Sequence, residues 1–292
     1  MSTIAKKVAE PKLINTFPNM LSEFVYKRTY AKWNGERREN WVETVDRYVE
    51  FLKEECPQTP ANVFADIREY MVAMQVMGSM RALWSAGFPA RRDNTCIYNC
   101  SFIPLDCLKA FSEGLYILMQ GTGVGFSVER QFVGNLPNVA TFDGVEVKHQ
   151  IVDSAEGWAD ALHLALVEGY KGHKVAFDYS LVRAAGSVLK TKGGRASGPD
   201  PLKNLLDYVQ ELLMGAQGRK LKSLECHDIM CKVGEIVVSG GVRRSALISF
   251  SDPEDEEMRH AKNWKRGEFP QHRYMANNSA YYQEKPSPEV FW

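Results

Sequence analysis

Two stretches of this sequence combine residue types that could do chemistry together. The first is Cys-Ile-Tyr-Asn-Cys-Ser-Phe from residue 96, which contains Cys100, and the second is Gln-Gly-Thr-Gly-Val-Gly-Phe from residue 120. A thiolate is a nucleophile and a redox group. A glycine-rich turn lets backbone amides come close to a ligand, because no side chains stand in the way. The pair predicts a redox-active thiol near a site for an anion or a nucleotide base.

Each cysteine has a plainer alternative. The sequence contains six: Cys56, Cys96, Cys100, Cys107, Cys226 and Cys231. Their spacings match no zinc pattern, and free cysteines are among the most buried residues, so an inert core thiol is the alternative reading of each. His227 and Cys231 are four residues apart and could share a metal on one helix face, but no further ligands accompany them. We therefore predict no metal site.

The glycine-rich runs suggest ligand contacts but not a Rossmann fold. The run from Gly121 to Gly125 follows a predicted helix and precedes a predicted strand, whereas a dinucleotide-binding fingerprint runs from strand to turn to helix. A tight turn without a ligand stays the alternative. A second loop, 192–201, leads into a predicted helix, where free amides beside Arg195 and Ser197 suit a phosphate or a polar ligand edge.

The overall composition does not favour any class of binding partner, so binding must depend on local groups of residues. Lys plus Arg and Asp plus Glu each number 36 in 292 residues, so no overall field attracts nucleic acid or an acidic membrane surface. No apolar run approaches the roughly 18 residues of a membrane span. The first residues also lack the apolar core of a signal peptide. We expect a cytoplasmic protein with no membrane and no direct nucleic-acid partner.

The surrounding pattern predicts an α/β fold. The first ninety residues indicate helices, one with the apolar spacing of Trp41, Val45 and Tyr48 and one over roughly 61–80. Beyond residue 96, short apolar runs alternate with helical ones, which implies crossover units and a mainly parallel sheet or barrel. The predicted strands are 97–103, 123–128, 174–178, 245–250 and 276–282, and the predicted helices are 106–119, 154–168, 200–214 and 224–238. A helix opening at Ser287-Pro288-Glu289, three residues before the chain stops, suggests a cut chain.

Together these segments resemble the monomeric, adenosylcobalamin-dependent class II ribonucleotide reductases of the ribonucleoside-triphosphate reductase type. The motifs occur in the family's order over nearly the whole chain, and as a set they are specific. They are Tyr26–Trp33, Glu39–Val45, Arg81–Trp84, Asn99–Cys100, Gly123–Val128, Glu156–Trp158, Gly193–Pro199, Val242–Ala246 and Ala276–Ser279.

The resemblance implies a fold and a division of the chain. It implies an N-terminal helical region, 1–90, followed by the first half of a ten-stranded α/β barrel, 91–292, ending before the family's finger loop. The region between Val128 and Asp153 is shorter than in the well-known monomeric enzymes, where extra sequence builds an effector pocket.

The resemblance also implies site residues. Cys100 falls on the family's first redox cysteine, which lies under the ribose and forms a disulfide in each turnover, and Asp153 with Ser154 resembles part of the deoxynucleotide effector site. The implied substrate-binding residues are Ser79, Asn99, Ser101, Gly121, Gly123, Gly194, Arg195, Ala196, Ser197 and Gly198.

The implied activity is reduction of ribonucleoside triphosphates through a thiyl radical, with adenosylcobalamin as cofactor and thioredoxin or a similar dithiol as reductant. The chain contains no Asn-Pro-Cys-Gly-Glu-type stretch for the thiyl cysteine and carboxylate. We therefore expect a split enzyme, active only with a complementary C-terminal chain. The alternatives are an inactive nucleotide-binding or regulatory remnant of the fold, an unrelated cytosolic enzyme, and a class I or diphosphate-using reductase.

Overall fold

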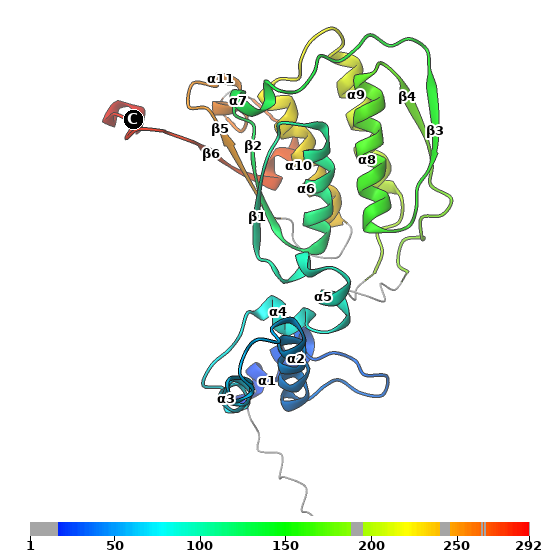
Figure 1. The fold of residues 1–292 in the computed structure, drawn as a ribbon. Helices are drawn as coiled ribbons and strands as arrows, with labels where there is room; N and C mark the ends of the chain where they lie inside the picture. The colour runs from blue at the N-terminus through cyan, green and yellow to red at the C-terminus, as the bar shows by residue number, and fades with distance from the viewer. Residues whose placement is uncertain (1–16, 188–194, 240–245, 264, 266, 292) are drawn as a thin grey trace, which may run out of the picture. The chain divides into compact units, whose positions relative to one another are not determined.

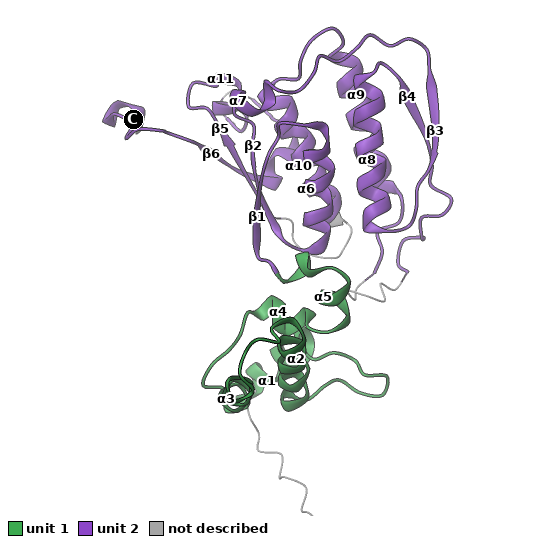
Figure 2. Ribbon diagram, in the orientation of Figure 1, with its two compact units in different colours: residues 1–97 green, residues 98–292 purple. Residues whose placement is uncertain are grey.

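The computed structural model describes residues 17–187, 195–239, 246–263, 265 and 267–291. The chain divides into two compact units, 1–97 and 98–292, each with its own hydrophobic core (Figure 2). We describe each unit by itself.

Unit 1 is helical. Its elements are α1 (Met20–Thr29), α2 (Trp41–Glu55), α3 (Ala61–Val72), α4 (Met80–Ser85), α5 (Phe88–Arg92) and the 3-10 helix η1 (Asn94–Ile97). Helix α2 begins with a capping box, in which the side chain of Asn40 accepts from the amide of Glu43 and the carboxylate of Glu43 accepts from the amide of Asn40. Its apolar stripe packs Trp41 and Val45 into the core, as the helical spacing predicted.

The helix predicted over 61–80 is wrong beyond residue 72. Helix α3 ends at Val72, and Met74 then adopts a left-handed backbone conformation with φ 56°. A methionine gains nothing intrinsic from that conformation, so the surrounding contacts must impose the break. The chain resumes as the separate short helix α4, with Ser79 as its N-cap.

Unit 2 is a mixed α/β fold with parallel sheets, which confirms the predicted class at that level (Figure 1). Its strands are β1 (Cys100–Pro104), β2 (Gly123–Ser127), β3 (Glu146–Gln150), β4 (Lys174–Asp178), β5 (Leu247–Ser251) and β6 (Ala276–Ala280). Its longer helices are α6 (Leu108–Gln120), α8 (Ala155–Tyr170), α9 (Asp200–Gly215) and α10 (Ser223–Ser239), and its short ones are α7 (Arg130–Val133), α11 (Glu256–Arg259), η3 (Gln271–Met275) and η4 (Pro288–Phe291).

The described strands form two separate sheets. One has the order β1-β2-β5-β6 and the other pairs β3 with β4. Helices α6 and α10 lie against the four-stranded sheet, α8 and α9 form the next layer, and β3 and β4 lie beyond them (Figure 1). The predicted strand 174–178 is thus outside the larger sheet. The half of a ten-stranded barrel stays a prediction.

Strand β3 was missed by the sequence prediction. Its residues alternate between exposed and half-buried, and four of the five are polar, so the run carries no apolar signal. Pairing with β4, in the register Val147 to Val175, makes it a strand. Tertiary contacts therefore decide this element.

A buried ionic network fixes α10 against the segment that leads into β6. The guanidinium of Arg273 donates to both carboxylate oxygens of Asp228 at 2.7 and 2.6 Å, and His227 Nδ1 lies 3.3 Å from Asp228 Oδ1. Burial by itself would raise the pKa of Asp228, but the hydrogen bonds to it hold the pKa well below its usual range. The carboxylate is therefore charged in the folded protein.

We predict that Asp228→Asn lowers the free energy of unfolding at pH 7 by about 3–5 kcal/mol, because it leaves Arg273 buried without its counter-charge. The depressed pKa gives stability that is present above the unfolded carboxyl pKa and lost as pH falls through that range. The gap between wild type and variant should therefore shrink below about pH 4. Urea unfolding from pH 3 to 7 measures this, with Glu257→Gln, which breaks the exposed ion pair with Lys222, as control. Equal losses in both variants would contradict the prediction.

Candidate functional site

A groove lies on the face of the four-stranded sheet that is turned away from α6 and α10. Its volume is about 730 Å³. On the opposite face of the same strands, Phe126, Ser249 and Ala276 are buried. The groove is lined by Cys100, Ser101, Phe102, Gly123, Val124, Gly125, Ala246, Leu247, Ile248, Phe250, Tyr274, Met275 and Asn277.

The floor of the groove is bare backbone because of the alternation along β2. Gly123 and Gly125 point the same way, since successive strand residues face opposite sides of a sheet. A methyl group at Gly125 would lie 3.4 Å from both Ile248 and Phe102, the residues that pair with it on β5 and β1. Phe102 and Phe250 form a side wall with ring centroids 6.0 Å apart. A flat polar molecule could therefore rest on β2 between apolar walls.

Cys100 stands at the start of β1, directly opposite Gly123 in the parallel ladder. The thiol is exposed, and the neighbouring position on β2 has no side chain to cover it. The amide of Gly123 donates to the carbonyl oxygen of Asn99 at 2.9 Å. The hydroxyl of Ser101 donates to the carbonyl oxygen of Gly123 at 3.1 Å. Backbone pairing thus brings together the two stretches on which the sequence prediction rests.

Gly121 has a different place from Gly123. It ends α6 as a left-handed C-cap with φ 90°, where a side chain would be strained, and it is absent from the groove lining. Only the second and third glycines of the run reach the groove. The first turns the chain from helix to strand.

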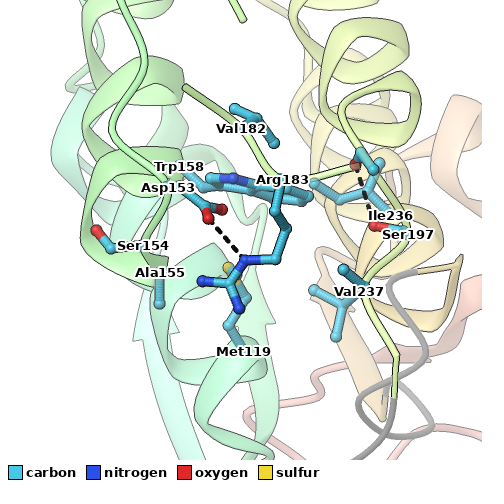
Figure 3. Close-up of a pocket in the computed structure, with 12 residues that line it drawn as sticks. Met119, Asp153, Ser154, Ala155, Trp158, Val182, Arg183, Ser197, Ile236 and Val237 are labelled. Carbon is cyan, nitrogen blue, oxygen red and sulfur yellow. Dashed lines mark hydrogen bonds and ion pairs between the residues drawn. The ribbon is translucent and has the colours of Figure 1, made fainter. Parts of the chain in front are cut away.

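A second cavity, of about 130 Å³, lies between α8, α10 and the segments 182–183 and 196–198 (Figure 3). Trp158 and Ile236 give it an apolar lining, and Arg183 and Asp153 give it an ion pair. The remaining lining residues are Met119, Ser154, Ala155, Val182, Ala196, Ser197, Gly198 and Val237.

The predicted effector residues open α8 at the edge of this cavity. The hydroxyl of Ser154 caps the helix by accepting from the amide of Gly157 at 2.9 Å. Asp153 accepts from Arg183 Nε at 2.6 Å. Ser154 therefore has a structural task of its own, whatever ligand the cavity takes.

Three predicted substrate-binding residues, Ala196, Ser197 and Gly198, line this second cavity together with Asp153 and Ser154. The two cavities share no lining residue. Gly198 has φ +78°, and a methyl group there would lie 3.0 Å from the amide nitrogen of Ala185, so the close turn requires glycine. The structure thus groups the loop with the predicted effector residues and not with Cys100.

The other predicted residues lie elsewhere. Arg195 is exposed and donates to the carbonyl oxygen of Gly186 at 2.9 Å, outside the cavity lining. Gly194 is outside the described residues. Ser79 belongs to unit 1, where its hydroxyl caps α4 by accepting from the amide of Ala82 at 3.4 Å.

Several cavity residues were missed by sequence reasoning. Phe102, Ile248 and Asn277 reach the groove only because parallel pairing lines them up across β1, β5 and β6. Arg183 lies shortly before the loop that contains Ala196, Ser197 and Gly198. Its positive charge near that loop could have identified it as a site residue. Trp158 was noted as part of a motif but was not proposed as a site residue.

Neither a metal site nor a membrane span is found where the structure describes the chain. Its described residues bring together no group of three or more His, Cys, Asp or Glu side chains that could hold a metal ion. None of the described helices is both long and apolar enough to cross a bilayer.

We predict that Ser154→Ala lowers the free energy of unfolding by about 1 kcal/mol, because the amide of Gly157 loses its acceptor at the start of α8. Ser154→Asp should retain most of that stability, since a carboxylate also caps a helix and favours its positive end. Urea unfolding of the two variants beside wild type measures the effect. Equal losses in both variants would contradict a capping role.

Comparison with known proteins gives a consistent result. A family model described as the ribonucleotide reductase alpha domain matches residues 6–88. The adenosylcobalamin-dependent ribonucleoside-triphosphate reductase of Euglena gracilis is 31% identical over 90% of this chain, and that of Lactobacillus delbrueckii subsp. bulgaricus is 28% identical over 87%. The matches cover 39% and 44% of those two proteins, so the chain spans less than half of the length of each.

A solved structure agrees with these relatives. The crystal structure of a B12-dependent (class II) ribonucleotide reductase superposes with a TM-score of 0.72 at 26% identity, covering 88% of this chain and 45% of that one. The resemblance predicted from the motifs is confirmed, and the chain is a relative of the adenosylcobalamin-dependent, class II ribonucleotide reductases.

Proposed function

We propose that this chain forms part of a ribonucleotide reductase that converts ribonucleoside triphosphates to 2′-deoxyribonucleotides, and that Cys100 is one of its two reducing thiols. The relatives' names support the reaction class and the triphosphate substrate. The observation that carries the proposal is the exposed Cys100 opposite Gly123, at the edge of a groove whose floor is backbone.

The chemistry explains why a thiol is needed there. Replacing the ribose 2′-hydroxyl by hydrogen releases water and takes up two electrons, which two thiols supply as they become a disulfide. An external dithiol then returns the pair to the reduced state by thiol exchange. Cys100 would provide one of the two sulfurs beneath the ribose, and its exposure leaves room for the second. Thioredoxin or a similar dithiol stays the proposed external reductant.

Adenosylcobalamin, when bound, supplies the radical that starts such chemistry. The described residues do not by themselves form an enclosed site for a corrinoid. The larger of the two candidate cavities is the open sheet groove, and the cavity beside Trp158 measures only about 130 Å³. We therefore assign none of these residues to the cofactor.

The open groove supports a requirement for a complementary reductase segment. Strands β1 and β6 are the outer strands of the described sheet, and Phe102 and Tyr274 expose 55% and 67% of their surface. Unpaired edges and exposed aromatic side chains are typical of a sheet that pairs with further strands. In our proposal that segment also provides the thiyl cysteine, the second thiol and the catalytic carboxylate, and completes the barrel. Its location on a separate chain stays a prediction.

The second cavity, of about 130 Å³, supports binding of the base of a deoxynucleotide effector, with the rest of the nucleotide outside it. Trp158 offers an aromatic surface for a base, Arg183 offers positive charge for a phosphate, and Ser197 offers a hydroxyl. The loop 196–198 lies there, so an occupant could alter its conformation. We propose that Asp153 and Ser154 belong to this effector site and that Asn99, Ser101 and Gly123 belong to the substrate site at the groove. Ser79, in unit 1, stays a predicted substrate-binding residue.

We predict that Cys100→Ser abolishes multiple-turnover reduction, because serine cannot form the disulfide. The assay combines this chain with a candidate complementary segment, adenosylcobalamin, a dithiol and a ribonucleoside triphosphate. Cys107→Ser is the matched control, since that thiol is also exposed but lies outside the groove lining. Full activity of Cys100→Ser would refute the assigned role. Nucleotide binding without reduction in any combination would favour the inactive remnant, and activity of this chain alone would refute the need for a complementary segment.

We predict that Gly123→Ala weakens substrate binding about tenfold, because a methyl group on the groove floor holds the nucleotide away from the backbone. The free energy of unfolding should change by less than about 1 kcal/mol. The new Cβ would lie 3.4 Å from Ala246, a tight but tolerable contact. Gly215→Ala, at a position with open space around it, is the control. Equilibrium dialysis with a labelled triphosphate measures binding by the two variants. Unchanged binding in Gly123→Ala would count against the groove as the substrate site.

A further inference from the structure

Two consecutive residues of α2 hold the two ends of the segment that carries Ser79. This segment, 78–87, consists of Gly78, the N-cap Ser79, helix α4, Ala86 and Gly87. Arg47 contacts its C-terminal end, and Tyr48 contacts its N-terminal end. Neither residue belongs to a proposed binding site. The inference drawn from them rests on the proposed role of Ser79 at the substrate.

Arg47 uses its donors in two directions. Its Nε and Nη2 donate to the carboxylate of Glu39 at 2.8 and 2.9 Å. Its Nη1 donates to the carbonyl oxygens of Leu83 and Ala86 at 3.1 and 3.0 Å. The last carbonyls of a helix have no partners within the helix, and a positive charge there also suits the helix dipole. Arg47 therefore caps α4 from a neighbouring helix.

Lys32 and Thr44 complete the same network. Lys32 Nζ donates to the carbonyl oxygen of Ala86 at 3.3 Å, and Thr44 donates its hydroxyl to Glu39 at 2.9 Å. Burial, reinforced by the nearby charge of Arg47, lowers the pKa of Lys32 to about 8. Placing two cations at one helix end has an electrostatic cost. A structure that needed only stability could use apolar residues here instead.

Tyr48 fixes the other end of the segment. A methyl group at Gly78 would lie 2.6 Å from the hydroxyl oxygen of Tyr48 and 2.9 Å from its ring carbon Cζ. The backbone before Ser79 therefore lies directly against the ring. Tyr48 is itself buried, so the ring has little freedom to move away. The close approach requires glycine at 78 and sets the starting point of α4.

We infer that Arg47 and Tyr48 are positioning residues for Ser79, because they hold α4 at both ends and so set the place and direction of that side chain. This gives a task to the Glu39–Val45 motif and to Arg47 and Tyr48, which lie two and three residues after its end. Asn40 and Glu43 cap α2, Glu39 and Thr44 orient Arg47, and α2 carries that arginine beside Tyr48. The directional hydrogen bonds of this network hold α4 in one position, whereas an apolar contact in their place would allow α4 to slide.

The test compares Arg47→Met with Arg68→Met. Arg68 is a matched control because it is also an arginine paired with a carboxylate. Its Nε and Nη2 donate to Asp46 at 2.6 and 3.3 Å, and neither bond involves α4. The first readout is amide hydrogen exchange of residues 79–87 in the full chain. We expect faster exchange at Leu83 and Ala86 in Arg47→Met, because their helical hydrogen bonds lose support, and no change in Arg68→Met.

The second readout is kinetic and uses the chain combined with its complementary reductase segment. Arg47→Met should raise KM for the triphosphate about tenfold and leave kcat within about twofold, since a displaced Ser79 weakens binding in the ground and transition states alike. Arg47→Lys should recover part of the loss, because lysine still places a cation at the carbonyls. A purely structural arginine would give unchanged KM in the folded fraction, and that result would overturn the inference.

Gly78→Ala tests the contact between Tyr48 and the N-terminal end of the segment without changing a charged residue. It should raise KM in the same way, and Tyr48→Leu in the same chain should restore part of the binding by making room for the methyl group. Failure of the restoration would overturn the role of Tyr48. If wild type binds no triphosphate, or if Ser79→Ala leaves KM unchanged, the proposed substrate site fails. If Ser79→Ala raises KM and the Arg47 and Gly78 variants do not, only the positioning role fails.

Discussion

The parallel pairing of β2 between β1 and β5 is the interaction on which the rest of unit 2 depends. The register sets Gly123 beside Cys100 and Gly125 beside Phe102 and Ile248. On the other face, the same strand buries Val124 and Phe126 against the helices. One strand thus gives the domain its core and leaves the floor of the groove without side chains. A shift of one residue would exchange the two faces and lose both.

The helical layers separate the two candidate sites. Helices α6 and α10 cover the inner face of the larger sheet, and α8 and α9 pack on them from the far side (Figure 1). The groove opens on the free face of the sheet, whereas the Trp158 cavity lies between α8 and α10 (Figure 3). A nucleotide at one site would therefore not contact the other directly. Any coupling between them would pass through α6 and α10 or through the loop before α9.

Unit 1 follows a different principle, in which polar contacts set positions within an apolar core. Tyr26, Thr44, Glu39 and Arg47 are linked by hydrogen bonds that end at the carbonyls of α4. Burial raises the pKa of Tyr26 to about 12, so its hydroxyl stays protonated beside Thr44. Internal contacts therefore account for Tyr26, the first residue of the Tyr26–Trp33 motif.

The sequence by itself determined most of the element types, the two glycine-rich runs and the family resemblance. Apolar spacing gave α2, α8, α9 and α10, and the order of motifs gave the resemblance. Tertiary structure decided the rest. It made a strand of the polar run Glu146–Gln150, broke the helix expected through residue 80, and placed the loop 196–198 with Asp153 instead of Cys100. Those outcomes depend on contacts between residues far apart in the chain, which local periodicity does not encode.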